Sequence, residues 1–452
     1  MPSYRGKFQY QSQTGAVLQQ GACQIQFDDK NFILTPEIGA PLSFDLGDVD
    51  AVASADYQIQ LPLYTGNTVQ LQQFGKAYED LSRTLIESHR KRMLECLLLE
   101  DLQEIDRFTG NFAFDRSGDA SISGTAEFRL FKTNLAVLPA AAQAFHVRLA
   151  GVDALRFDAQ NYEIVLEMSG DRLKLNRLAK RTELFHARLR ETIDAMNKES
   201  AEALHLILPF LNPDQLQAAA GTLHEGHSAS ASKLAAIHSR IPDALAANAV
   251  DKTLKPYYDD LLGRTAKGFL YAGFKLVRPE DRDRLGGVEE AVSDDADADY
   301  TSSAPMSGTD EGPPPALYWF FFPIAAQPGS TTPSNVVAWE ASSSSGRATY
   351  FFRLLEPAES ATLRDPARAA VAVERGVQSI NRVLAMLNFR RRPIYLSDDD
   401  LSGNPAFQRY PIAARRIPEL RRVRAAFLGR AMHSSFEAWQ GQVNAILLAA
   451  RS

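Results

Sequence analysis

One stretch of this sequence occurs twice, and the duplication limits the fold more than any other feature. Residues 23–50 and residues 126–153 align without a gap at an offset of 103 residues. Asn31 falls on Asn134, and the apolar pattern between the turns coincides as well. Matching turns and matching buried faces predict two copies of one domain. Further pairs of matching positions are Gly15 and Gly118, Gly21 and Gly124, Pro36 and Pro139, Val49 and Val152, and Leu85 and Leu189.

Within each copy, short apolar runs alternate with turn residues and then give way to a helical period. Residues 7–74 contain runs such as CQIQF, NFILT and LSFDL, which indicate six or seven antiparallel strands. From Gly75 on, apolar residues recur every three or four positions, which predicts one amphipathic helix of about 25 residues. The second copy repeats this order, with strands in 112–178 and a helix from Lys180 to about Leu208. A sheet this short should curl into a small barrel or sandwich that the helix closes.

This element order resembles the pleckstrin-homology (PH) and GRAM-like superfold over residues 1–208. PH domains usually carry a tryptophan in the closing helix, whereas the first tryptophan here is Trp319. PH domains that bind phosphoinositides place several basic residues in the first hairpin loop, which here reads QSQTG in one copy and DRSGD in the other. The resemblance therefore implies two tandem PH-like domains, but it does not imply that they bind phosphoinositides.

The rest of the chain changes composition twice. An alanine-rich part follows the repeats, and Asn212 with Pro213 is a typical helix start, so we expect a connector of three or four short helices. Between Glu280 and Glu311 there are 11 acidic residues and two basic ones, a composition typical of a disordered linker. Strand-like apolar runs and helices then predict an α+β domain with an arginine-rich tail. The predicted domains are the PH-like repeats 1–105 and 106–208, the helical connector 209–278, the acidic linker 279–315 and the C-terminal domain 316–452 of an α+β protein.

The bulk composition predicts a soluble, cytoplasmic protein. Hydrophobic residues make up 45% and charged residues 23% of the chain, as in globular domains. The formal net charge of -6 does not favour attraction of nucleic acid by the whole molecule. The sequence contains two cysteines, which do not make a pattern typical of a disulfide-stabilised fold. The amino terminus has no apolar segment of signal-peptide length, and the most apolar run, LYWFFFPIAA, is too short to span a bilayer.

An arginine cluster near the carboxyl end is the main candidate binding site. Residues 390–430 contain ten arginines, no lysine and only four acidic residues. The planar arginine side chain grips carboxylates and phosphates through two parallel hydrogen bonds, and aromatic residues lie between these arginines, as on nucleic-acid surfaces. Alternatively, the arginines pair with carboxylates of the same chain. The candidates for anion or partner binding are Arg390, Arg391, Arg392, Arg415, Arg416, Arg421, Arg422 and Arg424.

Signs of catalysis are weak, and we predict no cofactor. The sequence has no phosphate-binding loop, no dinucleotide-binding glycines and no nucleophile elbow. His224, His227 and His238 are weak metal candidates, for which a solvated loop is the competing interpretation. The sequence favours a non-catalytic interaction or scaffold protein that binds protein partners through its PH-like domains. The alternatives are binding of nucleic-acid phosphates or an anionic membrane surface by the arginines, and an enzyme in the C-terminal domain.

Overall fold

The computed structural model describes most of the chain as two compact units. The described residues are 3–100, 102–116, 120–168, 171–224, 226–276, 316–341, 348–404, 407 and 409–451. We call Met1–Thr192 with Arg409–Ile417 unit 1, and Ile193–Gln408 with Pro418–Ser452 unit 2. The predicted acidic linker, residues 279–315, lies outside the described residues.

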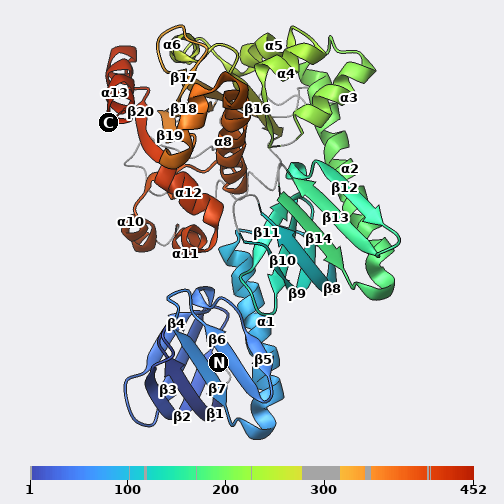
Figure 1. Cartoon of the computed structure of the whole chain (residues 1–452), viewed down its shortest axis with the longest axis vertical. Helices are drawn as coiled ribbons and strands as arrows, with labels where there is room; N and C mark the ends of the chain where they lie inside the picture. Colours follow the sequence, from blue (N-terminus) through green and yellow to red (C-terminus); the bar gives the residue numbers. More distant parts are fainter. Residues whose placement is uncertain are drawn as a thin grey trace, which may run out of the picture. The chain divides into compact units, whose positions relative to one another are not determined.

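The first repeat is a seven-stranded antiparallel sheet followed by a helix (Figure 1). Its strand order is β4-β3-β2-β1-β7-β6-β5, so that the first strand pairs with both the second and the seventh. The elements are β1 (Ser3–Gln11), β2 (Val17–Phe27), β3 (Asn31–Pro36), β4 (Leu42–Asp45), the 3-10 turn η1 (Leu46–Asp48), β5 (Ala53–Ala55), β6 (Gln58–Pro62), β7 (Thr68–Gln72), η2 (Gly75–Ala77) and α1 (Tyr78–Cys96).

The second repeat has the same elements in the same order, β11-β10-β9-β8-β14-β13-β12. This agreement confirms the duplicated fold and the element order that underlies the PH-like resemblance. Its elements are β8 (Glu104–Asp115), β9 (Ile122–Phe131), β10 (Asn134–Pro139), β11 (Phe145–Arg148), η3 (Leu149–Gly151), β12 (Ala154–Asp158), β13 (Glu163–Met168), β14 (Asp171–Asn176), η4 (Ala179–Arg181) and α2 (Thr182–Ile207).

Each repeat buries one face of its curled sheet under the closing helix. In the first repeat, the alternating residues Val69 and Leu71 of β7 are fully buried with Leu85 of α1. In the second repeat, the ring of Phe185 on α2 stacks on Phe108 with centroids 4.1 Å apart. The apolar side chains that alternate along the strands and those spaced three to four residues apart on the helix therefore pack in one core, as these patterns predict.

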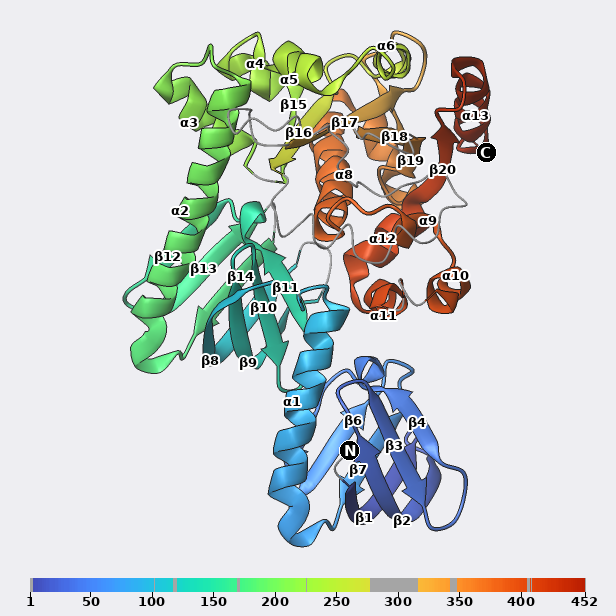
Figure 2. The ribbon, with the colours of Figure 1, turned by 180° about the vertical axis from the view of Figure 1, so that it is seen from behind.

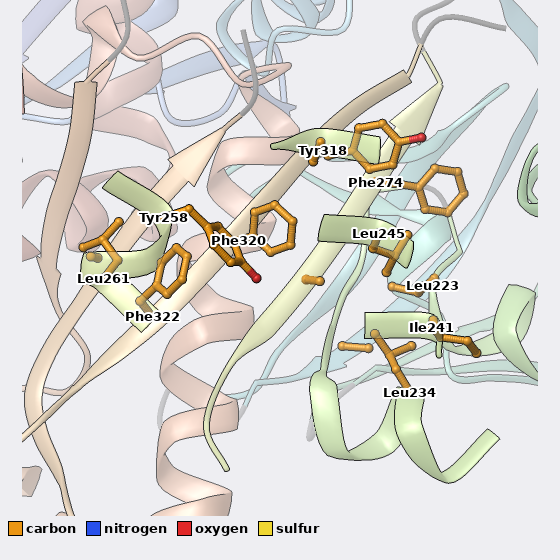
Figure 3. Close-up of a cluster of buried hydrophobic side chains, with 14 of the residues drawn as sticks. Leu223, Leu234, Ile241, Leu245, Tyr258, Leu261, Phe274, Tyr318, Phe320 and Phe322 are labelled. Carbon is orange, nitrogen blue, oxygen red and sulfur yellow. The ribbon is translucent and has the colours of Figure 1, made fainter. Parts of the chain in front are cut away.

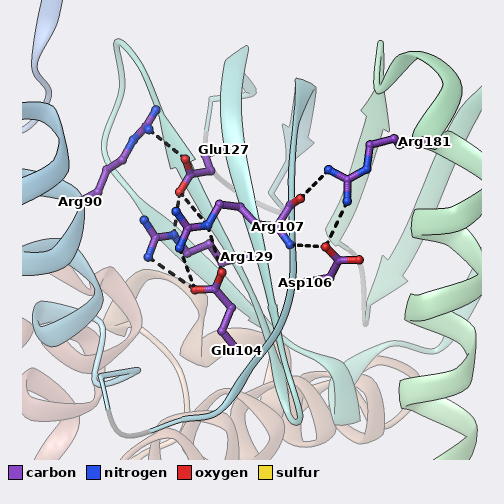
Figure 4. Close-up of polar contacts among 7 residues, drawn as sticks. All are labelled: Arg90, Glu104, Asp106, Arg107, Glu127, Arg129 and Arg181. Carbon is purple, nitrogen blue, oxygen red and sulfur yellow. Dashed lines mark hydrogen bonds and ion pairs between the residues drawn. The ribbon is translucent and has the colours of Figure 1, made fainter. Parts of the chain in front are cut away.

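Helix α1 also contacts the second repeat through Arg90, which joins an ionic network on β8 and β9, drawn in Figure 4. The buried Glu127 carboxylate accepts from Arg90 Nη1 at 2.9 Å and from Arg129 Nε at 2.6 Å. Glu104 accepts from Arg107 Nε at 3.0 Å on the same sheet. A buried carboxylate with two arginine partners holds its charge at a lower cost than one with none.

Unit 2 contains a six-stranded antiparallel sheet whose strand order follows the chain, β15-β16-β17-β18-β19-β20. This order differs from that of the repeats, in which the first strand pairs with the seventh. The strands are β15 (Ser228–Ser230), β16 (Tyr271–Leu276), β17 (Ala316–Ala325), β18 (Pro333–Ala341), β19 (Ala348–Arg353) and β20 (Phe427–Met432). The helices are α3 (Pro213–Thr222), α4 (Ala231–Ile237), α5 (Ile241–Ala249), α6 (Lys255–Arg264), η6 (Pro357–Arg364), α8 (Pro366–Met386), α9 (Arg392–Tyr395), α10 (Asp398–Gly403), α12 (Pro418–Ala426) and α13 (Phe436–Ala449), while α11 (Arg409–Arg416) belongs to unit 1.

The sheet of unit 2 is covered on both faces, which explains why β17 is the most apolar run of the chain. Tyr318, Phe320 and Phe322 pack with side chains from α3 to α6 and α13 in one core (Figure 3). On the other face, Trp319 donates from Nε1 to Asn381 Oδ1 of α8 at 2.9 Å. Strands that are buried on both faces read as continuous apolar runs rather than alternating ones. Figure 2 shows α8 along this sheet from the opposite side.

The structure differs here from the predicted helical connector, residues 209–278. The four short helices are present, and Asn212 caps α3 with a reciprocal bond to Gln215, as its sequence predicts. However, the same segment also supplies β15 and β16, and β16 pairs with β17. The connector is therefore part of the core of the C-terminal α+β domain. A short apolar run such as the one around Phe274 cannot be assigned to helix or strand from its period alone.

Candidate interaction site: an arginine helix on the first repeat

Helix α11 contacts the first repeat within unit 1 through the last two of its arginines. Arg415 Nη2 donates to Asp48 Oδ1 at 2.8 Å. Arg416 is almost completely buried; its Nε donates to the Gly47 carbonyl at 2.7 Å and its Nη1 forms an ion pair with Asp50. Two adjacent arginines thus bind one turn of the PH-like sheet. We call Asp45, Gly47, Asp48 and Asp50 the acidic turn.

The acidic turn is held in shape by the chain around it. The Asp45 side chain caps η1 by accepting from the Gly47 amide at 2.6 Å. The same carboxylate accepts two hydrogen bonds from Arg92 of α1, at 2.8 Å from Nε and 2.7 Å from Nη2. Paired bonds of this kind fix both position and orientation. The shape of the acidic turn is therefore held by contacts with α1 and within the turn itself, and not only by α11.

The two ends of α11 are also bonded within unit 1. At its start, Arg409 Nη1 donates to Glu100 Oε1 at 2.9 Å. At its end, Gln143 of the second repeat donates from Nε2 to the Arg416 carbonyl at 2.6 Å. That carbonyl is one of those left without a partner inside a helix, so the glutamine acts as a cap from outside.

Gly47 allows the close approach of α11. A Cβ added there lies 2.8 Å from Asp45 Oδ1, 2.9 Å from Cys96 Sγ and 3.0 Å from Ile412 Cγ2. All three distances are shorter than ordinary contacts, and they come from three different elements. The glycine therefore sets how deeply Ile412 packs.

We expect Gly47→Ala to loosen α11, because an added methyl group in a closed site costs about 1 to 2 kcal/mol. Amide hydrogen exchange of residues 409–417 should become faster by about tenfold. Gly151→Ala is the matched control, because it lies in the corresponding turn of the second repeat and its Cβ meets nothing within 4 Å. Equal exchange in both variants would contradict this role of Gly47.

The corresponding turn of the second repeat keeps an aspartate, Asp153, in the place of Asp50 but differs at the other three positions of the acidic turn. At the offset of 103 residues, Asp45 corresponds to Arg148, Gly47 to Ala150 and Asp48 to Gly151. The backbone is the same, since η1 and η3 each end in an extended residue whose amide donates to the first residue of the turn. The two copies therefore share a fold but differ in charge and in space at this surface.

Burial controls the electrostatics around the acidic turn. It raises the pKa of Asp48, although Arg415 acts in the opposite direction. Below the turn, the buried His89 donates from Nε2 to the Val49 carbonyl at 2.9 Å. Burial lowers the pKa of His89 to about 4, a shift that the bond to Val49 opposes and the charge of Arg416 increases. His89 is consequently neutral at physiological pH.

The other candidate arginines lie in unit 2, in two different settings. Arg390, Arg391 and Arg392 are buried, and Arg391 lies over the rings of Trp339 and Tyr350. The remaining three are on α12: Arg424 Nη2 donates to Asp398 Oδ1 at 2.6 Å, Arg422 lies 3.9 Å from Glu419, and Arg421 is exposed. Four of the eight candidate arginines, Arg390, Arg391, Arg392 and Arg416, are therefore buried.

The acidic partners of α11 could not be found from the arginine cluster itself. Asp48 is separated from Arg415 by 367 positions, and no pattern in the sequence links the two. A comparison of the two repeats does contain a signal, because the turn DLGDVD of the first copy corresponds to RLAGVD in the second. That difference in charge singles out the first turn.

The three histidines that are metal candidates have different neighbours in the structure. His224 and His227 are neighbours, with ring centroids 4.7 Å apart, whereas His238 packs on Phe210. Burial lowers the pKa of His227 to about 3. Among the described residues, no group of three or more histidine, cysteine or acidic side chains is placed to hold a metal ion.

Comparisons with known proteins were made at the level of family, sequence and structure. No protein-family model matches the sequence, and no curated protein matches it. Among solved structures, the chain is similar to the PH domain of USP37, with 15% identity over 20% of this chain and 96% of that one and a TM-score of 0.17. It is also similar to an N-terminally truncated linker-DH/PH fragment of p115-RhoGEF, with 10% identity over 26% of this chain and 47% of that one and a TM-score of 0.17.

The class of fold rests on the strand order and closing helix of the two repeats rather than on these scores. Each repeat is a seven-stranded antiparallel sheet followed by a helix, the element order that the PH-like resemblance predicts, and the described part of the chain is α+β. Within the described ranges, every helix is too short or too polar to cross a bilayer.

Proposed function

We propose that this chain is a cytoplasmic interaction protein without catalytic activity, whose PH-like repeats bind protein partners. The observation that carries the proposal is the contact between α11 and the acidic turn of the first repeat. There, a PH-like sheet binds a helix through two arginines, a backbone carbonyl and the apolar contact of Ile412 with Gly47.

This contact has the features of a recognition site for a short helix. Charge-assisted hydrogen bonds from Arg415 and Arg416 give orientation, and burial of Ile412 adds apolar contact area. The acceptors of Arg415 and Arg416 in this contact, the Asp48 and Asp50 carboxylates and the Gly47 carbonyl, all lie on the first repeat. A partner with two adjacent arginines on a short helix therefore fits the same surface.

A peptide of residues 409–418, RYPIAARRIP, tests the proposal in trans. The receptor is the full chain with Arg415→Gln and Arg416→Gln, which weakens its own α11. We expect the peptide to bind with a Kd of about 100 μM or tighter by isothermal titration calorimetry. Adding Asp48→Asn and Asp50→Asn to the receptor should weaken binding at least about tenfold, because the arginines lose their charged acceptors.

A peptide with glutamine at both arginine positions is the control for non-specific binding. Equal affinity for both peptides, or for both receptors, would falsify recognition by the acidic turn. Binding of heparin by the full chain tests the alternative function, which is recognition of phosphates or other anions by the arginines of α12. If Arg421→Gln with Arg422→Gln abolishes heparin binding while the peptide does not bind, α12 is an anion site and the function is phosphate recognition.

A further inference from the structure

We propose that the second repeat binds a small molecule that carries an aromatic ring and one oxyanion, in a pocket at the start of α2. This inference goes beyond the proposed function and concerns a different surface from the acidic turn. It rests on the pocket itself and on what the first repeat has in the same place.

The pocket has a volume of about 350 Å³ and is open to solvent. Its walls come from three segments of one repeat: the turn between β12 and β13, the end of β14 and the turn η4 that leads into α2. A volume of this size matches a single small molecule. The lining residues are Asn161, Tyr162, Asn176, Arg177, Ala179 and Thr182.

In the first repeat, a tyrosine occupies the corresponding position. Tyr78 is the first residue of α1 and corresponds to Thr182, the first residue of α2. Its ring packs on Tyr57 with centroids 5.2 Å apart, and its hydroxyl lies 2.7 Å from Ser54 Oγ. Tyr57 corresponds to Tyr162 in the second repeat. With threonine in place of Tyr78, the second repeat keeps the first tyrosine and lacks the ring that packs against it.

The surrounding backbone is the same in both copies, which makes the side-chain differences informative. Gln73 and Gly75 have φ angles of 61° and 54°, and their counterparts Arg177 and Ala179 have 55° and 52°. The same left-handed turn therefore presents a glutamine in the first repeat and an arginine in the second.

Arg177 supplies the positive charge of the pocket. It is exposed, and within the described part of the chain its guanidinium has no hydrogen bond or ion pair. An arginine side chain in this state can bind a carboxylate or phosphate through two parallel bonds. Glu163, an acid that bonds to the lining residue Asn176 at 3.4 Å, is also paired with Lys174 at 3.6 Å, so its charge is partly compensated.

The remaining walls favour an aromatic body on the ligand. The ring of Tyr162 is about half exposed and is held edge-on against Phe157, with centroids 6.2 Å apart. Its free face can stack a ligand ring. The Thr182 hydroxyl donates to the Ala179 carbonyl at 3.0 Å, which leaves its oxygen able to accept a hydrogen bond.

Titration of the full chain with phenyl phosphate and with benzoate tests the proposal, and benzyl alcohol is the uncharged control probe. We expect at least one anion to bind with a Kd of about 1 mM or tighter, and the alcohol to bind at least about tenfold more weakly. Arg177→Gln, which copies the first repeat, should weaken anion binding by about tenfold or more. Thr182→Tyr, which also copies the first repeat, should abolish it.

Arg172→Gln is the matched control, because Arg172 is an exposed arginine of β14, the strand that leads to Arg177, and lies 3.4 Å from Glu167. It should bind the probes as the unmodified chain does. If the Thr182→Tyr variant does not fold because the added ring does not fit beside Phe157, the Arg177→Gln variant still tests whether the pocket binds the anion. Absence of binding by either anion, or equal loss in the Arg172 and Arg177 variants, overturns the proposal. Asp48→Asn with Asp50→Asn should leave probe binding unchanged, so failure here is distinct from failure of the peptide test.

Discussion

Replacing Arg416 by glutamine should release α11 from the first repeat. The substitution removes the ion pair with Asp50 and the bond to the Gly47 carbonyl from an almost completely buried position. Loss of one partner from a buried pair costs 3 to 5 kcal/mol, and the partial exposure of Asp50 reduces this to about 2 to 3 kcal/mol. Hydrogen exchange of residues 409–417, followed by mass spectrometry, should become faster by about 30-fold or more.

Arg422→Gln is the matched control for this prediction. It is the same substitution in the same arginine-rich segment, at a half-exposed side chain that lies 3.9 Å from its acidic neighbour. Exposed pairs contribute about 0 to 1 kcal/mol, so exchange of residues 409–417 should not change. If the Arg416 variant exchanged as slowly as the unmodified chain, the ionic contacts of α11 would not be what holds it.

Unit 1 should lose stability in acid because of His89. Its pKa is about 4 in the folded chain and about 6.5 in an unfolded one, so the unfolded state binds a proton first as the pH falls. The contribution is fully present above about pH 6.5 and is lost as the pH falls to about 4. A shift of this size corresponds to about 3 kcal/mol. His89→Gln should remove that part of the pH dependence.

Urea unfolding at pH 7.5 and at pH 4.5 can separate the two units. The three tryptophans, Trp319, Trp339 and Trp439, all lie in unit 2, so their fluorescence reports unit 2 while circular dichroism reports both units. His89→Gln should change the circular dichroism transition and leave the fluorescence transition as it was. His227→Gln should change the fluorescence transition, because that histidine lies in unit 2 and burial lowers its pKa. A His89 variant with unchanged pH dependence would show that this residue is not the acid-sensitive group.

The repeats could be predicted from the sequence because their information is local. Strand alternation, the turn glycines and the change of period near Gly75 can each be recognised within a few residues. Because the domain occurs twice, the same pattern could be recognised independently in each copy. Strand β15 was missed because it has only three residues and no apolar pattern. Strand β16 was missed because an apolar run beside alanine-rich helices fits either assignment.

The candidate site was predicted only in part, for a different reason. The arginines were visible as a cluster, and their pairing with the chain's own carboxylates was one of the alternatives, beside a protein or anionic partner and nucleic acid or an anionic lipid surface. For Arg415 and Arg416 the structure has that pairing. Which carboxylates they use depends on long-range packing, so the acidic turn could be recognised only by comparing one repeat with the other.

The divergence of the two turns has a consequence for stoichiometry. A tandem of two like domains suggests two equivalent places for any partner, and binding at two equivalent sites is strengthened by tethering. Here Arg148, Ala150 and Gly151 stand where the first copy has Asp45, Gly47 and Asp48. A helix that binds the first turn through two arginines therefore meets a charge of the same sign, Arg148, and a methyl group in place of Gly47 at the second. If the first repeat binds such a partner, we expect the duplicated molecule to offer it one site rather than two.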